Sequence, residues 1–323
     1  MKVFSRVLVT GGAGFIGSHL VEALVASGAE VTVLDNLSTG HRRNLDSVGK
    51  SVTLVEGDIR DRALLDQLTR SCDVVFHHAA IVSVTQSVSD PALSCDVNDL
   101  GTVRVLDACR KNGVGRVVMA SSSAVYGDGP ILPKTETMPA CPLSPYAVQK
   151  LSGEHYAAVF GRLYGLETVC LRYFNVYGPR QTPSSPYSGV ISLFVSNAVS
   201  GRPPTIYGDG SQTRDFVHVG DVVRANLLAA TQKAAAGRVF NVGTGVSTRI
   251  RDLWDTIQEL SLTKTAPVFA PPRAGDIQDS CSDISAITQC LDFTPKVTIH
   301  QGLSDTLAWY HHGNGKIPGY RAQ

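Results

Sequence analysis

The sequence has almost no net charge and no long apolar run. Its 29 Lys and Arg residues balance 28 Asp and Glu residues, for a formal charge of +1. A basic nucleic-acid-binding surface is therefore not expected. A helix that spans a bilayer needs about 20 consecutive apolar residues, so we expect no membrane segment. The first residues lack the charged and apolar regions of a secretory signal, which predicts a cytoplasmic protein.

Cysteine is sparse and shows no pairing pattern. The seven cysteines are odd in number, are scattered along the chain and include no CxxC pair. That pattern argues against a disulfide framework and a zinc site, and it favours reduced thiols in a cytoplasmic protein. His77 and His78 are adjacent and lack the spacing of metal ligands. We therefore predict no bound metal.

What the sequence does contain is a regular alternation of short β-branched runs and longer amphipathic stretches. Hydrophobic residues make up 43% of the chain and charged residues 18%, as in a globular protein. The pattern predicts strands at 6–10, 31–35, 52–56, 73–77, 116–120 and 167–173, and helices at 15–27, 61–70, 91–112 and 145–163. Such repetition predicts an α/β fold, a Rossmann-type doubly wound parallel sheet covered by helices on both faces.

The pattern becomes irregular after about residue 175. Loops rich in Pro, Gly and Ser alternate there with predicted helices near 187–200, 220–232, 248–259 and 299–311 and a strand near 214–219. We expect a first domain over residues 1–175, to which about 220–260 return, and a smaller C-terminal α/β lobe over 176–323 that caps the sheet and binds substrate.

A glycine-rich turn follows the first predicted strand. In "VTGGAGFIGSHL", residues Gly11, Gly14 and Gly17 form a GxxGxxG pattern that opens the first predicted helix. Glycines there allow a tight turn, a close approach of the backbone to a pyrophosphate and close packing of helix on strand, and the helix N-terminus attracts the phosphates. The strand–turn–helix context predicts a dinucleotide-binding site.

Asp35, at the end of the second predicted strand, favours NAD over NADP. A carboxylate about 20 residues beyond the glycines hydrogen-bonds the ribose hydroxyls and repels a 2′-phosphate. Asp58 follows the third predicted strand, where it either bonds the adenine amino group or caps the next helix.

The stretch "SPYAVQK" places Tyr146 and Lys150 on one helix face. Ser144 is a good N-cap and Pro145 suits the first helical position. A tyrosine is a poor base at neutral pH because its pKa is about 10. A lysine ammonium and the positive charge of NAD both favour the phenolate, so we expect them to lower the pKa of Tyr146.

A set of specific motifs runs along nearly the whole chain. It includes "TGGAGFIG", "GDIRD", "HHAA", "SSSAVYG", "YAVQK", "RYFNVYGPR", "GDGSQTRDFVHV", "NVGTG" and "RAGD". In these motifs the chain resembles the extended short-chain dehydrogenase/reductases of the NAD-dependent epimerase/dehydratase family. Within that family it resembles the UDP-hexose 4-epimerases, and among them most closely the subgroup that acts on UDP-N-acetylglucosamine.

The resemblance implies a role for each matching residue. Tyr146 is the catalytic base, Lys150 its partner on the nicotinamide ribose, Ser122 the hydroxyl on the reacting sugar oxygen and Ser123 a second polar contact. Residues implied to bind NAD are Gly11, Gly14, Phe15, Ile16, Gly17, Asp35, Asn36, Asp58, Ile59, Ala79, Ala80, Asn98, Tyr146, Lys150 and Tyr173. Residues implied to bind the UDP-sugar are Ser83, Ser122, Asn175, Tyr207, Arg214, Arg273, Asp276 and Ser280.

The resemblance further implies NAD-dependent epimerisation of a UDP-hexose at C4 through a 4-keto intermediate. Tyr146 takes the proton of the C4 hydroxyl, and the keto sugar turns about its diphosphate link before it is reduced on the other face. Related dehydratases carry an Asp–Glu pair where this chain has Ser123 and Ala124, so elimination is not expected. A UDP-glucuronate 4-epimerase, and a catalytically silent protein that binds NAD and a nucleotide sugar, remain alternatives.

Four features favour N-acetylated substrates. Val82 stands where many hexose epimerases have a lysine, and Ser83 and residues 180–191 resemble the UDP-N-acetylhexosamine subgroup. Ser280 lies four residues after Asp276, where a tyrosine would fill the space of an N-acetyl group. We expect activity on UDP-GlcNAc and UDP-GalNAc, alongside UDP-Glc and UDP-Gal.

Two predicted helices bear on the oligomeric state. Residues 91–112 and 145–163 are long enough to expose an apolar stripe each. Family members commonly pair these helices across a dimer interface, so the resemblance implies a homodimer.

Overall fold

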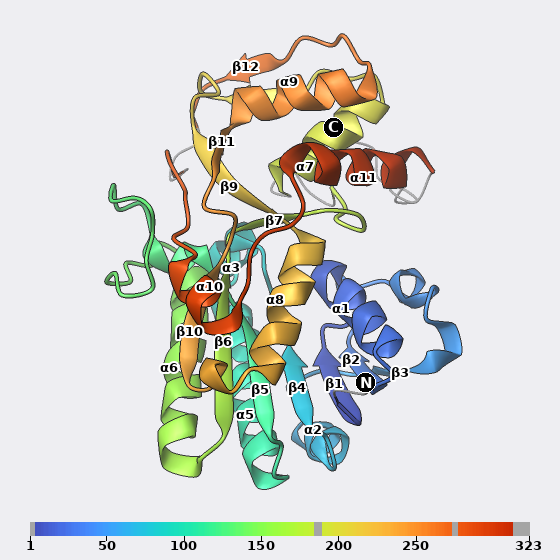
Figure 1. Cartoon of the computed structure of the whole chain (residues 1–323), viewed down its shortest axis with the longest axis vertical. Coiled ribbons are helices and arrows are strands. Elements are labelled where there is room, and N and C mark those ends of the chain that lie inside the picture. Colours follow the sequence, from blue (N-terminus) through green and yellow to red (C-terminus); the bar gives the residue numbers. More distant parts are fainter. Residues whose placement is uncertain (1–3, 184–188, 273–276, 313–323) are drawn as a thin grey trace.

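A central sheet of seven parallel strands organises the protein in the computed structural model, which describes residues 4–183, 189–272 and 277–312 (Figure 1). The strands are β1 (Arg6–Thr10), β2 (Glu30–Asp35), β3 (Val52–Glu56), β4 (Val74–His77), β5 (Arg116–Ser122), β6 (Glu167–Tyr173) and β10 (Arg238–Val242). Their order across the sheet is β10–β6–β5–β4–β1–β2–β3. The predicted doubly wound Rossmann-type fold is confirmed.

The seventh strand, β10, was not predicted from the sequence. It pairs with β6 in parallel, so that Phe240 lies beside Leu171. Its five residues follow α8 (Val219–Thr231), beyond the region where strands and helices alternate regularly. Only its long-range pairing with β6 identifies it as part of the sheet.

Helices cover both faces of the sheet because side chains along each strand alternate in direction. Val7 and Val9 of β1 face α1 (Phe15–Ala26) and α8, whereas Leu8 belongs to the apolar cluster on the opposite face. That second cluster is completed by residues of α2 (Arg62–Thr69), α5 (Gly101–Lys111) and α6 (Pro145–Tyr164). The strands are therefore buried on both sides, as their continuous Val/Leu/Ile runs predict.

The predicted helix over 91–112 is interrupted. The chain forms α3 (Val84–Ser89), α4 (Pro91–Cys95), a π-helical turn (Asp96–Leu100) and then α5. Inside the π turn, Asn98 directs its side chain to the backbone of Ile81, and its carbonyl accepts a hydrogen bond from Thr102 Oγ1 at 2.5 Å. The contacts with Ile81, which lies outside the helix, cannot be read from the local pattern, so periodicity predicted one continuous helix.

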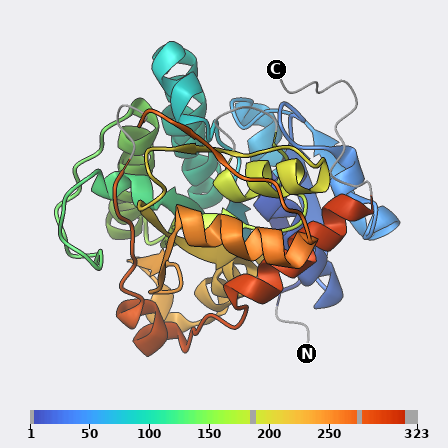
Figure 2. The ribbon, with the colours of Figure 1, turned by 90° about the horizontal axis from the view of Figure 1, so that it is seen from above.

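A smaller lobe lies over the carboxyl ends of the strands, at the top of Figure 1, and Figure 2 looks down on it. Its core contains Trp254, Phe194 and Leu303. Its elements are β7 (Asn175–Tyr177), β8 (Thr205–Tyr207), β9 (Thr213–His218), β11 (Ser247–Arg249), β12 (Val268–Ala270), α7 (Val190–Val199), α9 (Ile250–Ser261) and α11 (Ile299–His311). The predicted helices near 187–200, 248–259 and 299–311 and the strand near 214–219 correspond to α7, α9, α11 and β9.

The late helix α10 (Ser285–Leu291) returns to the first sheet. Its residues Ile287 and Leu291, together with Phe293, belong to the same apolar cluster as Phe240 of β10. The chain thus crosses between the central sheet and the smaller lobe more often than the sequence pattern indicates. The domain limits at about residues 175 and 220–260 stay a prediction. Within the described ranges, no helix is long and apolar enough to cross a membrane.

Candidate active site

The glycine turn after β1 forms a cradle that side chains would fill. Gly11 adopts a φ of +70°, and a Cβ atom there would lie 2.7 Å from the backbone nitrogen of Ala79. A Cβ on Gly17 would lie 2.2 Å from the carbonyl oxygen of Gly11. Gly14 is the N-cap of α1, whose first residues are Phe15 and Ile16.

This cradle lies at the carboxyl ends of the neighbouring strands β1 and β4, where the strand order reverses. In doubly wound sheets that crevice binds the dinucleotide. The bare backbone and the N-terminus of α1 fit a pyrophosphate.

Asp35 holds the segments beside the cradle. Its carboxylate accepts hydrogen bonds from the backbone nitrogens of Ala13 at 2.9 Å and Leu37 at 2.8 Å. The side chain is buried, and both oxygens retain further acceptor sites for ribose hydroxyls. The carboxylate is thus fixed next to the glycine turn, as an NAD-selective acidic residue requires.

Asp58 does not cap the helix after β3. The N-cap of α2 is Asp61, which accepts from Leu64 N, so the capping interpretation of Asp58 is wrong. Asp58 instead accepts from Asn36 Nδ2 at 3.0 Å and pairs with Arg60 at 2.9 Å. The hydrogen bonds from Arg60 lower the pKa of the Asp58 carboxyl to about 2, so it is charged at neutral pH. The neighbouring Ile59 is buried.

The chain after β4 is fastened by two polar side chains. Ala79 N donates to Thr10 Oγ1 at 3.3 Å, and Ala80, the next residue, is half-buried. Asn98 accepts from Ile81 N at 2.8 Å and donates to Ile81 O at 2.9 Å. Asn98 is buried, and its amide therefore shapes the wall of the site through the backbone.

The local sequence determines where α6, the helix that carries the predicted catalytic pair, begins. Ser144 accepts from Ala147 N at 3.2 Å as the N-cap of α6, and Pro145 is the first helical residue, as predicted. Tyr146 and Lys150 follow one turn apart, and Lys150 Nζ lies 5.8 Å from the centroid of the Tyr146 ring. The predicted pair is therefore assembled in the fold.

The end of β5 meets this pair. Lys150 Nζ donates to the carbonyl oxygen of Ala120 at 2.8 Å. Ser122 shares a hydrogen bond with the Tyr146 hydroxyl. Ser122 Oγ also accepts from Ala124 N at 3.2 Å, which anchors the turn that begins at Ser123.

Burial dominates the protonation of the pair. Desolvation raises the pKa of the Tyr146 hydroxyl, and the hydrogen bond with Ser122 only partly opposes that rise. Desolvation lowers the pKa of the Lys150 ammonium to about 8. The protein's own groups therefore do not produce the lowered Tyr146 pKa that the sequence predicted. Desolvation of the phenolate outweighs the opposing effect of Ser122.

Tyr173 directs its hydroxyl into the protein. The oxygen lies 3.0 Å from His78 Nε2 and accepts from Asn226 Nδ2 of α8 at 2.8 Å. Burial raises the pKa of this hydroxyl. With its polar atom engaged internally, Tyr173 has only its ring left for contact with a cofactor.

On the substrate side, the structure aligns Arg214 with the segment that carries Ser280. Thr213 N donates to Gln278 O at 3.0 Å, and Ser280 N donates to Thr213 O at 3.2 Å. Arg214, the next residue of β9, donates to Thr213 O at 2.7 Å and to Gln278 O at 3.3 Å. Two residues predicted 66 positions apart as substrate contacts thus lie in adjacent segments.

The other predicted substrate residues lie at separate places. Asn175 is exposed at the start of β7, and Ser83 caps α3 by accepting from Gln86 N at 3.1 Å. Arg273 and Asp276 lie outside the described residues.

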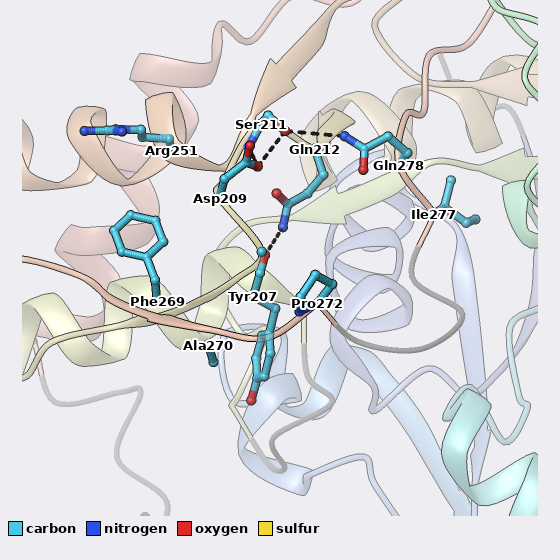
Figure 3. Close-up of a pocket in the computed structure, with 11 residues that line it drawn as sticks. Tyr207, Asp209, Ser211, Gln212, Arg251, Phe269, Ala270, Pro272, Ile277 and Gln278 are labelled. Carbon is cyan, nitrogen blue, oxygen red and sulfur yellow. Dashed lines mark hydrogen bonds between the residues drawn. The ribbon is translucent and has the colours of Figure 1, made fainter.

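A cavity of about 850 Å³ opens in the smaller lobe (Figure 3). Tyr207 is the predicted residue that lines it, and Gln212 Nε2 donates to Tyr207 O at 2.7 Å. The sequence missed its other lining residues, which are Gly208, Asp209, Ser211, Gln212, Arg251, Phe269, Ala270, Pro272, Ile277 and Gln278. The motif "GDGSQ" was the available signal for four of them. Tyr146 and Lys150 do not line this cavity.

Among the described residues, no group of three or more His, Cys, Asp or Glu residues lies close enough to hold a metal ion. All seven cysteines are free thiols.

Comparison with known proteins identifies the family. The profile of the NAD dependent epimerase/dehydratase family matches residues 7–243. The UDP-glucose 4-epimerase of Mycolicibacterium smegmatis is 42% identical over 311 residues, which cover 95% of this chain and 99% of that protein.

Two solved structures agree. UDP-N-acetylglucosamine 4-epimerase from Methanobrevibacter ruminantium in complex with UDP-N-acetylmuramic acid is 40% identical and superimposes with a TM-score of 0.93, covering 97% of this chain and all of that one. UDP-glucose 4-epimerase from Thermus thermophilus in complex with NAD is 42% identical, with a TM-score of 0.85 over 94% of this chain and 98% of that one. The resemblance seen in the motifs is confirmed: the chain is an enzyme of the NAD dependent epimerase/dehydratase family, and its cofactor is NAD.

Proposed function

We propose that this enzyme epimerises a UDP-sugar at C4. The observation that carries the proposal is the assembly of Ser122, Tyr146 and Lys150 beside the glycine cradle. The turn after Ser122 reads Ser123–Ala124 and offers no carboxylic acid to protonate a leaving group. The dehydratases of the family need such an acid, so epimerisation is the better match.

In this proposal each side chain has a limited task. NAD, when bound, supplies the oxidation and reduction at the sugar carbon. Tyr146 accepts the proton of the C4 hydroxyl and later returns it, and Ser122 holds the same oxygen. The ammonium of Lys150 stabilises the Tyr146 phenolate and binds the nicotinamide ribose. General-base assistance of this kind contributes about 10²–10⁴-fold to a rate.

We propose that the nucleotide diphosphate binds in the smaller lobe. Arg214 and Arg273 contact the diphosphate, because a guanidinium matches two phosphate oxygens at once. Asn175, Tyr207 and Asp276 bind the remainder of the UDP, and Ser83 lies toward the sugar. Because the two arginines hold the diphosphate, the sugar beyond it remains free to present either face of C4 to the cofactor.

For the sugar, we propose UDP-GlcNAc and UDP-GalNAc, with UDP-Glc and UDP-Gal as further substrates. The small side chain of Ser280, beside the strand of Arg214, supports this choice, because it leaves room for an N-acetyl group. Of the three relatives named above, two are UDP-glucose 4-epimerases and one is a UDP-N-acetylglucosamine 4-epimerase. UDP-glucuronate 4-epimerase activity and a silent binding protein are the remaining alternatives.

One experiment separates these possibilities. Purified protein is incubated with UDP-Glc, UDP-GlcNAc and UDP-GlcA in turn, and the C4 epimers are resolved by NMR. We expect both epimers of the N-acetylated pair to appear. Turnover of UDP-GlcA alone would favour the glucuronate enzyme, and bound NAD without turnover of any UDP-sugar would favour the silent protein.

We also propose a homodimer. The outer face of α6 exposes Val148, Tyr156 and Val159 around a groove of about 410 Å³, and Leu163 is exposed further along the helix. Leu93 and Leu100 add exposed apolar area on the neighbouring segment. A contiguous apolar face of this kind favours association, and a second copy of the same helices is its occupant in this proposal.

Light scattering at micromolar concentration tests the dimer. We expect twice the chain mass for the wild type and the single chain mass for Val148→Glu/Val159→Glu. A wild-type monomer would contradict the proposal. We further propose that the enzyme works in the cytoplasm, where its free thiols remain reduced.

A further inference from the structure

A buried ion pair lies directly behind the catalytic pair. Glu154 of α6 and Arg172 of β6 are each 6% exposed. Arg172 Nε donates to Glu154 Oε1 at 2.9 Å, and Arg172 Nη2 donates to Glu154 Oε2 at 2.7 Å. This two-point geometry fixes the carboxylate in position as well as in charge.

The carboxylate is joined to the same strand end as the catalytic residues. Ser121 Oγ donates to Glu154 Oε1 at 2.5 Å. Its neighbours on β5 bind the preceding turns of α6, since Ala120 O accepts from Lys150 and Ser122 contacts Tyr146. Three consecutive residues of β5 therefore hold three successive turns of α6.

The guanidinium of Arg172 is held from its other side. Arg172 Nη1 donates to the hydroxyl of Tyr126 at 2.8 Å, and that hydroxyl donates to Asn241 Oδ1 at 2.6 Å. Asn241 belongs to β10 and Tyr126 to the turn after Ser122. Glu154 is thus held directly by β5 and β6, and its partner Arg172 is linked through Tyr126 to β10.

Few charges reach the buried ammonium of Lys150. Glu154 lies one turn along the same helix, and its negative charge favours the protonated form of Lys150. The titratable groups that face Lys150 from the packed elements are Tyr146 and Glu154 of α6, His77 and His78 at the end of β4, and Cys170 of β6. Burial lowers the pKa values of both histidines to about 3, so they are neutral at working pH. Burial also raises the pKa of the Cys170 thiol, which is neutral as well.

We propose that Glu154 is a positioning residue for the catalytic pair, whose carboxylate, fixed by Arg172 and Ser121, keeps Lys150 protonated and aligned on Ala120 beneath Tyr146. This inference rests on the proposed function for its kinetic consequence. Its electrostatic part concerns only the charge state of Lys150 and is measurable without turnover.

The test compares variants that separate charge from shape. Glu154→Gln keeps the side-chain length but removes the charge and leaves Arg172 unneutralised. Glu154→Asp keeps the charge and shortens the side chain. Glu154→Gln/Arg172→Gln removes both charges and provides a folded neutral pair should the single variant prove unstable.

Glu167→Gln is the matched control. Glu167 pairs with the buried Arg116 through Nε at 2.9 Å, at the opposite end of the same strands. The substitution removes the carboxylate of another Arg–Glu pair between β5 and β6, one in which the glutamate is exposed, without changing the surroundings of Lys150.

Two measurements are made on each variant. The first is the pH dependence of kcat/KM for the best UDP-sugar. The second is the pH titration of the lysine side chains by NMR of protein labelled with ¹³C at lysine Cε, in which Lys150 is assigned by its absence from Lys150→Met.

We expect Glu154→Gln to move the alkaline limb of kcat/KM, and the Lys150 titration, to lower pH by about one unit, because loss of a nearby opposite charge favours the neutral amine. The double variant should move the alkaline limb and the Lys150 titration in the same direction, but by a smaller amount. Glu154→Asp and Glu167→Gln should leave both in place, whatever their effect on stability.

An unshifted Lys150 titration in folded Glu154→Gln or in the double variant would overturn the inference. A shifted titration in a protein that turns over no UDP-sugar would support the electrostatic role while refuting the proposed function. A uniform loss of rate without any shift would assign Glu154 a purely structural role.

Discussion

Lys150 Nζ lies 5.8 Å from the centroid of the Tyr146 ring, one turn along α6, and both side chains are half-buried. At that distance an ammonium stabilises a phenolate strongly, because little water screens the two charges. The same burial lowers the pKa of Lys150 to about 8. The cation is therefore available at neutral pH and is lost as the pH rises through that value.

The pH profile should report this lysine. We expect kcat/KM to fall as the pH rises above about 8, because deprotonation of Lys150 removes the charge that supports the Tyr146 phenolate. Lys150→Met should lose about 10²-fold or more in kcat, and its residual activity should rise with pH without that alkaline limb. Initial rates from pH 6 to 10 test this. A wild-type rate that stays level to pH 10 would contradict the assignment.

Tyr146→Phe should abolish turnover while leaving the fold intact. The substitution removes the proton acceptor, which predicts a loss of about 10²–10⁴-fold in kcat. It removes only the contact of this hydroxyl with Ser122, so the free energy of unfolding should change by no more than about 1 kcal/mol. Steady-state rates, urea unfolding and UDP binding by calorimetry check the three parts. A rate within a few-fold of wild type would exclude Tyr146 as the base.

Asp35 should determine the choice of dinucleotide. Asp35→Ala removes the acceptor for Ala13 N and Leu37 N, so NAD binding should weaken and the free energy of unfolding should fall by about 1–3 kcal/mol. Asp35→Asn is the matched control, because it removes the charge but keeps an acceptor oxygen. Both variants should discriminate less against NADP in equilibrium binding. A wild type that prefers NADP would show that the acidic residue has been misinterpreted.

Ser280→Tyr should suppress N-acetylated substrates selectively. The backbone of Ser280 is held by Thr213 O, so a larger side chain must occupy the space beside the Arg214 strand. Rejection by clash is expected to lower kcat/KM for UDP-GlcNAc well below that for UDP-Glc. Ser280→Ala, which keeps the space open, should leave the ratio unchanged. Equal slowing of both substrates in Ser280→Tyr would mean that this residue does not control the sugar.

The local sequence determined the first half of the fold well. Strands 6–10, 52–56 and 167–173 coincide with β1, β3 and β6, because each apolar run has the short period of a buried strand. Helix α6 begins where Ser144 and Pro145 indicate, since a cap depends only on the next few residues. The glycine spacing and Asp35 likewise predicted the dinucleotide site, because their chemistry is confined to one strand–turn–helix unit.

Long-range contacts decided the rest. The strand β10 is defined by its pairing with β6. The π turn at Asp96–Leu100 is defined by the hydrogen bonds between Asn98 and the backbone of Ile81. Asp61 caps α2, and Asp58 instead accepts a hydrogen bond from Asn36 and pairs with Arg60. The sequence by itself predicted Tyr146 and Lys150 as the catalytic pair. Only the tertiary structure set their protonation, because desolvation and the placement of Glu154 depend on strands distant in the chain.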